Sequence, residues 1–326
     1  MRVLWTHNFN PSNPNAGCFM HTSAKGLRAL GVDVQFEFLG NLRSPWNVLA
    51  ARKRVRLRAR DFDVVHAQYG SACAFVTAGV DDRPTVVTVR GNDWNLHNET
   101  FHPLYFHTRL ARAMTRRSLG LFSAVIPVSQ RLANELVNLV PTSKIKVIPA
   151  AIDLDRWKDV FLLGERNSKN AVIAKTCSVL FTNSRMKDPI KRSALCNLTI
   201  AIAKKRMTGI TLKVASTIPY EDMPSYVSSC DAILCVSESE GWPNSVKEAL
   251  ACNVPFVATD ISDLQAIAAQ EPTCRVCEPS ATVLANNLCE VLEMARPTTL
   301  RKYVEQMGLV PSSKNLLSVY QSLVDC

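Results

Sequence analysis

Several features that mark other classes of protein are missing from this sequence. No run of eighteen uncharged apolar residues occurs in the 326 residues, so no membrane-spanning helix is expected. The loop after the first apolar run has no complete Gly-x-Gly-x-x-Gly sequence, and a nicotinamide cofactor is therefore not supported. Among eleven cysteines the one close pair is Cys274 and Cys277, which makes a zinc or redox site a minor alternative. The other cysteines are expected to be small buried apolar residues in a reducing cytosol.

The residues that are present describe an α/β protein of two domains. The chain is 47% hydrophobic and 20% charged, which is enough apolar material for two cores at this length. Short apolar runs alternate with helical patterns, and the chain opens with a strand, a glycine-containing loop, a helix and a strand. This order is typical of a doubly wound, Rossmann-like domain with a parallel sheet.

Positive charge is concentrated in the first half of the chain. The net charge is +10; residues 1–155 hold 19 basic and 11 acidic side chains, and residues 156–326 hold 19 and 17. One predicted helix contains Arg52, Lys53, Arg54, Arg56, Arg58 and Arg60. Its basic surface could meet anionic lipid headgroups or a lipid-phosphate acceptor, or it could be a solvated helix face. Contact with nucleic acid has less support, because no RNA-binding motif accompanies the basic run.

The most informative stretch runs from Val236 to Ala258. It reads as the end of a strand, a short loop, a helix that Asn244 and Ser245 are expected to cap, and a second strand. The N-terminus of such a helix suits a phosphate, because its N–H groups are unpaired and its dipole end is positive. A carboxylate repels a phosphate, so Glu240 in the loop and Glu248 in the helix are expected to bind hydroxyl groups beside it. The alternative is that both are solvated surface residues.

The sequence from Glu240 to Ala251 resembles the Glu-x(7)-Glu signature of glycosyltransferase family 4. The members of this family are retaining, metal-independent transferases of the GT-B fold, in which two Rossmann-like domains face each other across a cleft. The resemblance implies that Glu240 contacts the sugar of a nucleotide-sugar donor and that Glu248 contacts its ribose. Main-chain amides would line the sugar and the diphosphate at Gly241, Trp242, Asn244 and Ser245. It implies no cofactor and no metal, and a donor of the UDP or GDP type.

A second match to the family follows the expected strand at residues 177–182. Arg185 and Lys191 lie six residues apart across a turn that contains a proline, so both cations could reach one diphosphate. Family members carry an Arg and a Lys at this spacing, where they hold the donor diphosphate and stabilise the leaving nucleotide without a metal. A loop of solvated charges is the alternative. Ile218, after the next expected strand, matches more weakly a loop that touches the nucleotide base.

The first half of the chain matches the family more loosely. Gly17 corresponds to a glycine near the donor phosphate and sugar, with a simple turn as the alternative. Gly91 and Asp93 match a Gly-x-Asp pattern at a strand end, where Asp93 is expected to be a catalytic residue on the acceptor side or, alternatively, a helix N-cap. Arg90 stands where the family often has a His, and it is expected to hold an anionic acceptor or the donor phosphate. The family's usual Asn-Gly turn is Ala150-Ala151 here.

Together these features predict a GT-B glycosyltransferase that acts in polysaccharide biosynthesis. We expect an acceptor-side domain at residues 1–155, a nucleotide-sugar-binding domain at 156–310, and a helix at 311–326 that packs back toward the first domain. The enzyme would pass a sugar to a glycan or a lipid-linked acceptor in the cytoplasm, at the inner face of the membrane. Two alternatives remain: a nucleotide-sugar epimerase of the same fold, and a donor-binding protein that has lost transfer.

Overall fold

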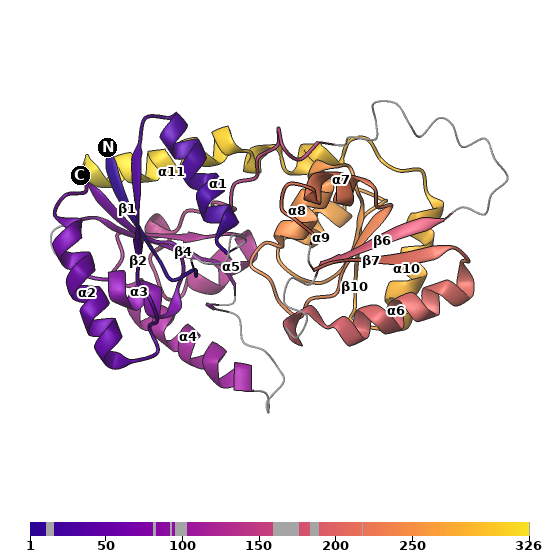
Figure 1. The fold of residues 1–326 in the computed structure, drawn as a ribbon, viewed down its shortest axis with the longest axis horizontal. Helices are drawn as coiled ribbons and strands as arrows, with labels where there is room; N and C mark the ends of the chain where they lie inside the picture. The colour runs from indigo at the N-terminus through magenta and orange to yellow at the C-terminus, as the bar shows by residue number, and fades with distance from the viewer. Residues whose placement is uncertain are drawn as a thin grey trace. The chain divides into compact units, whose positions relative to one another are not determined.

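The computed structural model describes residues 1–10, 16–80, 83–91, 93–94, 103–158, 176–182, 189–216 and 218–325, with no side chains described for residues 103–108. It divides into two compact units (Figure 1). One unit is Met1–Ile152 with Ser239–Trp242 and Met307–Cys326, and the other is Asp153–Glu238 with Pro243–Gln306. The first unit therefore ends three residues before the expected limit at residue 155, and the C-terminal helix groups with it.

The first unit is built on a five-stranded parallel sheet. Its strands are β1 (Arg2–His7), β2 (Asp33–Phe38), β3 (Val64–Ala67), β4 (Thr85–Val89) and β5 (Ala124–Pro127). The strand order is β2-β1-β3-β4-β5, and every neighbouring pair is parallel. The chain moves to one side of β1 to add β2 and to the other side to add β3. The sheet therefore has a switch point between β1 and β3, where such sheets bind ligands at the carboxyl ends of the strands.

Helices cover both faces of this first sheet. They are α1 (Cys18–Ala29), α2 (Pro45–Ala59), α3 (Ser71–Thr77), α4 (Pro103–Leu119), α5 (Gln130–Leu136) and α11 (Leu309–Val324), with a 3-10 turn at Thr142–Lys144. Side chains alternate along β1: Val3 and Trp5 join a core with α1 and α11, whereas the Thr6 hydroxyl lies 2.7 Å from the Thr77 hydroxyl on α3. Helix α5 is capped by Ser129, whose Oγ accepts a hydrogen bond from the Leu132 N–H.

The C-terminal helix α11 is joined to the first sheet by a buried hydrogen-bond network. Trp5 Nε1 donates to the Tyr320 hydroxyl at 3.0 Å, and that hydroxyl also bonds to His66 Nδ1. The other ring nitrogen of His66 bonds to the Thr88 hydroxyl at 2.8 Å. Burial lowers the pKa of His66 well below its usual value, so the imidazole is neutral. His66 is therefore a structural residue, as its position in an apolar strand predicts.

The second unit repeats the plan with another five-stranded parallel sheet. Its strands are β6 (Cys177–Thr182), β7 (Ile210–Ala215), β8 (Ala232–Cys235), β9 (Phe256–Thr259) and β10 (Arg275–Cys277), in the order β10-β9-β8-β6-β7. Its switch point lies between β6 and β8. The inner strands β8 and β9 are almost entirely apolar and fully buried, because both faces of the sheet are covered there.

The helices of the second unit are α6 (Ser193–Arg206), α7 (Met223–Ser228), α8 (Asn244–Ala251), α9 (Leu264–Ala268) and α10 (Ala281–Glu293). Helices α6 and α10 pack on one face of the sheet and form a core with Val179, Leu234 and Val257. Residues 299–307, whose sequence pattern favours a helix, form two 3-10 turns, Leu300–Tyr303 and Glu305–Met307. A third 3-10 turn, Pro189–Lys191, follows β6.

The ten described cysteines are free thiols, and nine of them are buried. Burial raises the pKa of Cys274 to about 12 and also raises that of Cys277, so neither thiol of the Cys-x-x-Cys pair favours the thiolate form that metal binding requires. Within the described part of the chain, no helix combines the length and the apolar character that crossing a membrane requires.

Candidate active site

The loops after β6 and β8 hold most of the residues predicted to bind a donor. The two strands are neighbours at the switch point of the second sheet. The Glu238 N–H donates to the Ile190 carbonyl at 2.8 Å and ties the two loops together. Lys191, the last residue of the 3-10 turn, is therefore held next to the loop that leads to Glu240. Arg185, the predicted partner of Lys191, lies outside the described residues.

The loop after β8 is also fixed at its start, and its central residues are grouped with the first unit. The Thr259 hydroxyl, at the end of β9, donates to the Ser237 carbonyl at 2.6 Å. Residues Ser239–Trp242 group with the first unit, and they include the partly exposed Glu240 and the buried Trp242. A side chain at Gly241 would overlap the carbonyl of Arg90. Glycine is therefore required at this position for the backbones to come this close.

Helix α8 begins at Asn244 but is capped differently from the prediction. Its N-cap is Pro243, and neither Asn244 nor Ser245 forms the expected cap. The Asn244 Oδ1 instead accepts a hydrogen bond from Lys247 Nζ at 3.2 Å, and the Lys247 side chain is buried. The prediction was wrong because the proline fixes the helix entry without a side-chain cap. Asn244 and Ser245 lie in the first turn, where their N–H groups face the helix N-terminus.

Glu248 lies one turn into α8 and is half-buried. Burial raises the pKa of its carboxyl group to about 8, although the charges of Lys247 and Arg156 oppose the shift. A carboxyl group with so high a pKa lacks enough hydrogen-bond donors around it to stabilise its negative charge. It is therefore suited to a ligand that brings donors, such as a pair of hydroxyl groups.

At the end of β4 the structure gives Asp93 hydrogen bonds to the backbone, and its catalytic role stays a prediction. Asp93 is fully buried, and its carboxylate accepts hydrogen bonds from the N–H groups of Gly70, Arg90 and Gly91 at 2.6 to 3.2 Å. Burial raises its pKa, and these backbone donors oppose that shift. Gly91 has a φ of 114°, which favours glycine. Asp93 thus holds the loop in place.

Arg90 lies at a cleft in the first unit. Its Nε and Nη2 donate to the carbonyl and side-chain oxygens of Gln68, and its guanidinium lies 4.0 Å from the ring centre of Phe19. Burial lowers its pKa to about 10, so it remains a cation at neutral pH. The cleft has a volume of about 30 Å³, and Ala150 and Ala151 contribute to its wall.

The wall of the same cleft carries polar groups that lack partners. Gln68 Nε2 and the hydroxyls of Ser312 and Ser313 are buried and bond to nothing among the described residues. Buried polar groups in folded proteins are normally hydrogen-bonded, to water or to a ligand if not to protein. With Arg90 beside them, these groups are suited to one small group, such as an anionic oxygen or a hydroxyl. Gly17, the other glycine predicted at a site, has a φ of 76° and is the N-cap of α1. Its carbonyl accepts hydrogen bonds from the Met20 and His21 N–H groups, in the segment that follows β1 at the first switch point.

Comparisons with known proteins place this geometry in a family. A model described as Glycosyltransferase Family 4 matches residues 4–156, and one described as Glycosyl transferases group 1 matches residues 198–307. A protein of Bacillus subtilis (strain 168) that is named as the teichuronic acid biosynthesis glycosyltransferase TuaC is 23% identical to this chain. The match covers 87% of this chain and 87% of that protein. The chain belongs to the GT4-type glycosyltransferases.

Solved structures agree with the fold of this glycosyltransferase. Sucrose-phosphate synthase from Thermosynechococcus elongatus matches with a TM-score of 0.78 at 14% identity, over 100% of this chain and 99% of that one. HepE from Anabaena, in complex with UDP-glucose, matches with a TM-score of 0.69 at 18% identity, over 99% and 100%. At such identities the likeness shows the fold alone, and that fold is of the GT-B type.

Sequence reasoning missed one residue beside the candidate donor site of this glycosyltransferase. Arg156 donates to the Tyr220 carbonyl at 2.6 Å, and its guanidinium lies 3.9 Å from the centre of the Tyr220 ring. Its charge acts on Glu248, and its Nε is buried without a hydrogen bond among the described residues. Tyr220 closely follows the partly exposed Ile218 after β7. The signal in the sequence that could have found Arg156 was Asp153. Its carbonyl and side-chain oxygens accept hydrogen bonds from the Arg156 N–H and so begin the turn that carries Arg156.

Proposed function

We propose that this glycosyltransferase moves a sugar from a nucleotide-sugar to a glycan or lipid-linked acceptor, with retention of anomeric configuration and without a metal ion. The observation that carries the proposal is the position of Glu248 in α8, the helix that follows β8 at the switch point of the second sheet, where burial also raises the pKa of its carboxyl group. The structural likeness to HepE, whose structure contains UDP-glucose, supports a UDP-sugar as the donor. A GDP-sugar is the second candidate.

In the proposed donor complex, Glu248 accepts hydrogen bonds from the ribose hydroxyls. The backbone amides of Gly241, Trp242, Asn244 and Ser245 bind the sugar and the diphosphate, and Glu240 orients the sugar. Lys191 and Arg185 neutralise the phosphate charge, which replaces the role of a metal ion. Gly17 and Ile218 complete the set at the diphosphate and at the base.

The acceptor in this proposal binds at the cleft beside Arg90. The guanidinium suits a carboxylate or phosphate on the acceptor, and Gln68, Ser312 and Ser313 offer hydrogen bonds to hydroxyl groups. Gly91 and Asp93 are positioning residues that hold Arg90 in place. The name of TuaC, which refers to an acidic glycan, supports an anionic acceptor.

The proposed reaction proceeds on one face of the donor sugar. The acceptor hydroxyl oxygen forms a bond to the anomeric carbon while the bond from that carbon to the diphosphate oxygen breaks. The leaving diphosphate takes the hydroxyl proton, so no protein nucleophile is required. Lys191 and Arg185 stabilise the negative charge that develops on the diphosphate.

We place this activity in the cytoplasm, at the inner face of the cell membrane, where a lipid-linked acceptor would be found. The family assignment favours transfer over the epimerase and binding-protein alternatives, and nucleic acid remains an unsupported partner. An epimerase would convert the donor sugar without an acceptor, and a binding protein would hold the donor unchanged.

Thermal unfolding with a panel of UDP-, GDP-, ADP-, dTDP- and CMP-sugars tests the donor site. One donor should raise the Tm of the parent protein, and Glu248→Ala or Lys191→Ala should lose that shift. Glu290→Ala, a change to an exposed carboxylate on α10, is the matched control and should keep it. If no donor raises the Tm of the folded parent, the proposal is wrong. Donor consumed with no acceptor present would instead identify an epimerase.

A further inference from the structure

Helix α2 carries the basic run, and the structure divides its cations into two sets. Residues 41–60 contain seven basic and no acidic side chains. One set faces the body of the first unit and is bonded there. The other set faces outward, together with apolar side chains. Only the outward set is available to a partner of the first unit.

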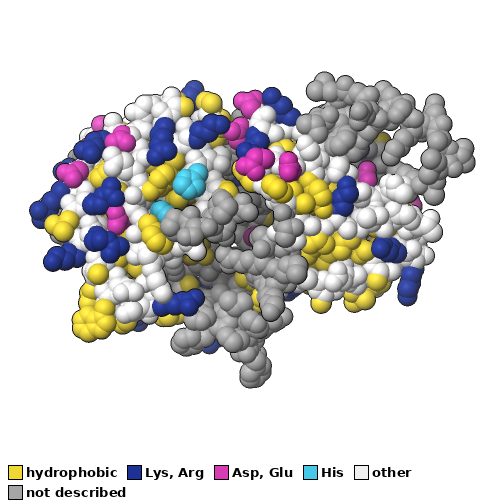
Figure 2. Space-filling model, in the orientation of Figure 1, with side chains coloured by type: hydrophobic (Ala, Val, Ile, Leu, Met, Phe, Trp, Pro, Cys, Tyr) yellow, Lys and Arg dark blue, Asp and Glu magenta, His cyan; other side chains and the backbone are white. Residues whose placement is uncertain are grey.

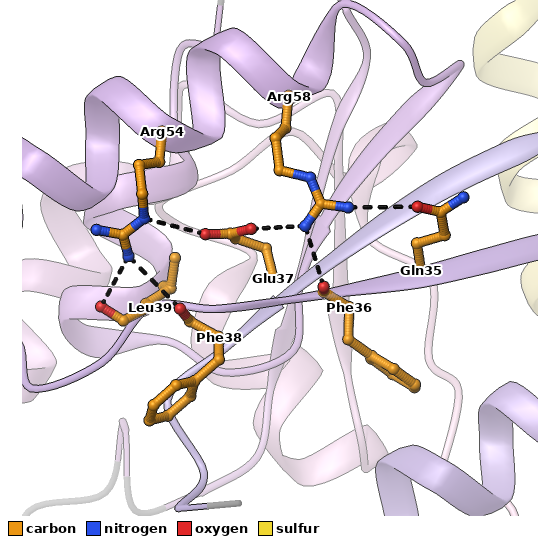
Figure 3. A network of polar contacts seen from close by, with 7 residues as sticks. All are labelled: Gln35, Phe36, Glu37, Phe38, Leu39, Arg54 and Arg58. Carbon is orange, nitrogen blue, oxygen red and sulfur yellow. Dashed lines mark hydrogen bonds and ion pairs between the residues drawn. The ribbon is translucent and has the colours of Figure 1, made fainter.

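The inward set joins α2 to the edge of the sheet. Arg54 Nε lies 3.2 Å from one carboxylate oxygen of Glu37 on β2, and Arg58 Nη1 lies 2.7 Å from the other. Figure 3 shows the carboxylate between the two guanidinium groups. The Glu37 side chain is only 10% exposed, so these ion pairs are stronger than surface pairs. On the other flank, Arg52 donates to the carbonyls of Phe75 and Ala78. These three arginines hold the helix in place.

The outward set combines aromatic, aliphatic and basic side chains. Trp46 is 79% exposed, Leu49 is 59% exposed and Leu57 is 54% exposed. Lys53, Arg56 and Arg60 are exposed as well. At 100° per residue these six positions fall within an arc of roughly 100° that lies opposite the buried residues of the helix. We call these six residues the outer face of α2.

The exposure of Trp46 has no explanation in the packing of the first unit. The chain has five tryptophans, and the other four are at most 6% exposed. Ala51, Val55 and Ala59 already anchor α2 to the core, so the apolar residues on the opposite side are additional to what folding needs. Figure 2 shows hydrophobic side chains among many Lys and Arg side chains at the left of the view, where Figure 1 places α2. An exposed patch of this kind marks an interaction site.

We propose that the outer face of α2 docks on the surface of an anionic lipid bilayer. The helix would lie in the plane of the interface, with Trp46, Leu49 and Leu57 at the boundary between headgroups and acyl chains. Lys53, Arg56 and Arg60 would meet the headgroup phosphates. This arrangement of apolar anchors and flanking cations is typical of interfacial helices. The proposal names the partner that the membrane location in the proposed function requires, and it can fail independently of the donor site.

The charge pattern favours a bilayer over other occupants of this face. A second copy of the chain would bring the same cations together, and residues 41–60 offer no carboxylate to pair with them. A nucleic acid would satisfy the cations but would leave Leu49 and Leu57 exposed to water, because aliphatic side chains provide no stacking surface for bases. A bilayer with anionic headgroups satisfies both kinds of side chain.

Co-sedimentation of the full chain with vesicles tests the proposal. The parent should bind vesicles of equimolar phosphatidylglycerol and phosphatidylcholine far better than vesicles of phosphatidylcholine alone. The triple variant Lys53→Gln, Arg56→Gln, Arg60→Gln should bind the anionic vesicles roughly a hundredfold more weakly, from the contribution of each cation near such a surface. The control Lys204→Gln, Lys205→Gln, Arg206→Gln removes the same charge from exposed positions at the end of α6 and should bind like the parent.

Tryptophan fluorescence reports directly on the outer face, because Trp46 is the exposed tryptophan of the five. Anionic vesicles should shift the parent emission to shorter wavelength, and Trp46→Phe should abolish the shift while it keeps most of the binding. The variants should also keep the Tm increase with the donor, which separates this test from that of the donor site. The proposal is overturned if the parent does not bind anionic vesicles, or if the outer-face and control variants bind alike. Concentration-dependent dimerisation lost in Leu49→Ser, without vesicle binding, would assign the face to a second copy.

Discussion

The raised pKa of Glu248 predicts that nucleotide-sugar binding strengthens with pH. Burial raises this pKa to about 8, so at pH 7 the free protein carries mostly the protonated carboxyl group. A carboxylate can accept hydrogen bonds from both ribose hydroxyls, whereas a protonated carboxyl group uses one oxygen as a donor. If the bound state requires the carboxylate, the proton must be removed before or during binding. The binding free energy at pH 7 is reduced by the cost of removing it.

The size of the effect follows from the pKa. With a pKa of about 8, roughly nine-tenths of the Glu248 carboxyl groups are protonated at pH 7 and about one-tenth at pH 9. The apparent Kd should therefore fall about tenfold between these values, which is about 1.4 kcal/mol. Binding at pH 7 should also release close to one proton. Arg156→Gln removes a charge that lowers this pKa, so the tenfold change should move to higher pH in that variant.

Isothermal titration calorimetry measures both quantities. The donor that raises the Tm is titrated between pH 7 and 9, in buffers of low and high ionisation enthalpy, so that proton release appears as a difference in heat. Glu248→Gln cannot ionise and should show weak binding with no dependence on pH over this range. A flat Kd in the parent, or the same slope in Glu248→Gln, would refute the reasoning, because the titrating group would then lie elsewhere.

Four further predictions concern backbone contact and buried polar groups. Gly241→Ala should lower the Tm and weaken donor binding at least tenfold because its side chain would overlap backbone, whereas Gly120→Ala, with open space around it, should do neither. Tyr320→Phe should lower the free energy of unfolding by about 1–3 kcal/mol, measured by thermal unfolding, because it leaves buried hydrogen-bond partners unbonded. The neutral His66 in this network should also make the parent less stable as pH falls below about 6.5, because the unfolded chain takes up the proton at a higher pH than the folded protein does. Arg296→Lys should lower the free energy of unfolding by roughly 2 kcal/mol in the same assay. The guanidinium donates to four carbonyls, and an ammonium group cannot reach them all.

The sheets were predictable from the sequence because parallel strands covered on both faces are short apolar runs. Residues 232–236 and 255–259 show this pattern, and β8 and β9 lie there. The parallel pairing of the strands also follows from the alternation of strand and helix, together with the right-handed crossovers of such units. The apolar pattern could not show whether residues 299–307 form one helix or two 3-10 turns, since both have similar periods.

The role of Asp93 was not predictable, because it depends on contacts between distant segments. The Gly-x-Asp pattern shows that Asp93 follows a strand but not that the N–H of Gly70 would donate to it across the sheet. Arg156 was hidden for the same reason, since Tyr220 lies 64 residues away in the sequence. Sequence motifs report which residues a family shares. They do not report which of those residues face a ligand and which hold the loop that does.

Helix α2 shows why a count of charges cannot replace the structure. Its six cations between residues 52 and 60 suggest one basic surface, yet Glu37 and backbone carbonyls already bind three of them. Neutralising Arg54 and Arg58 would leave the Glu37 carboxylate nearly buried without a partner, and breaking such a pair is strongly destabilising. Loss of vesicle binding in that variant would therefore follow from unfolding as readily as from lost attraction. Changes on the outer face remove attraction to the lipid and keep the contacts of Arg52, Arg54 and Arg58.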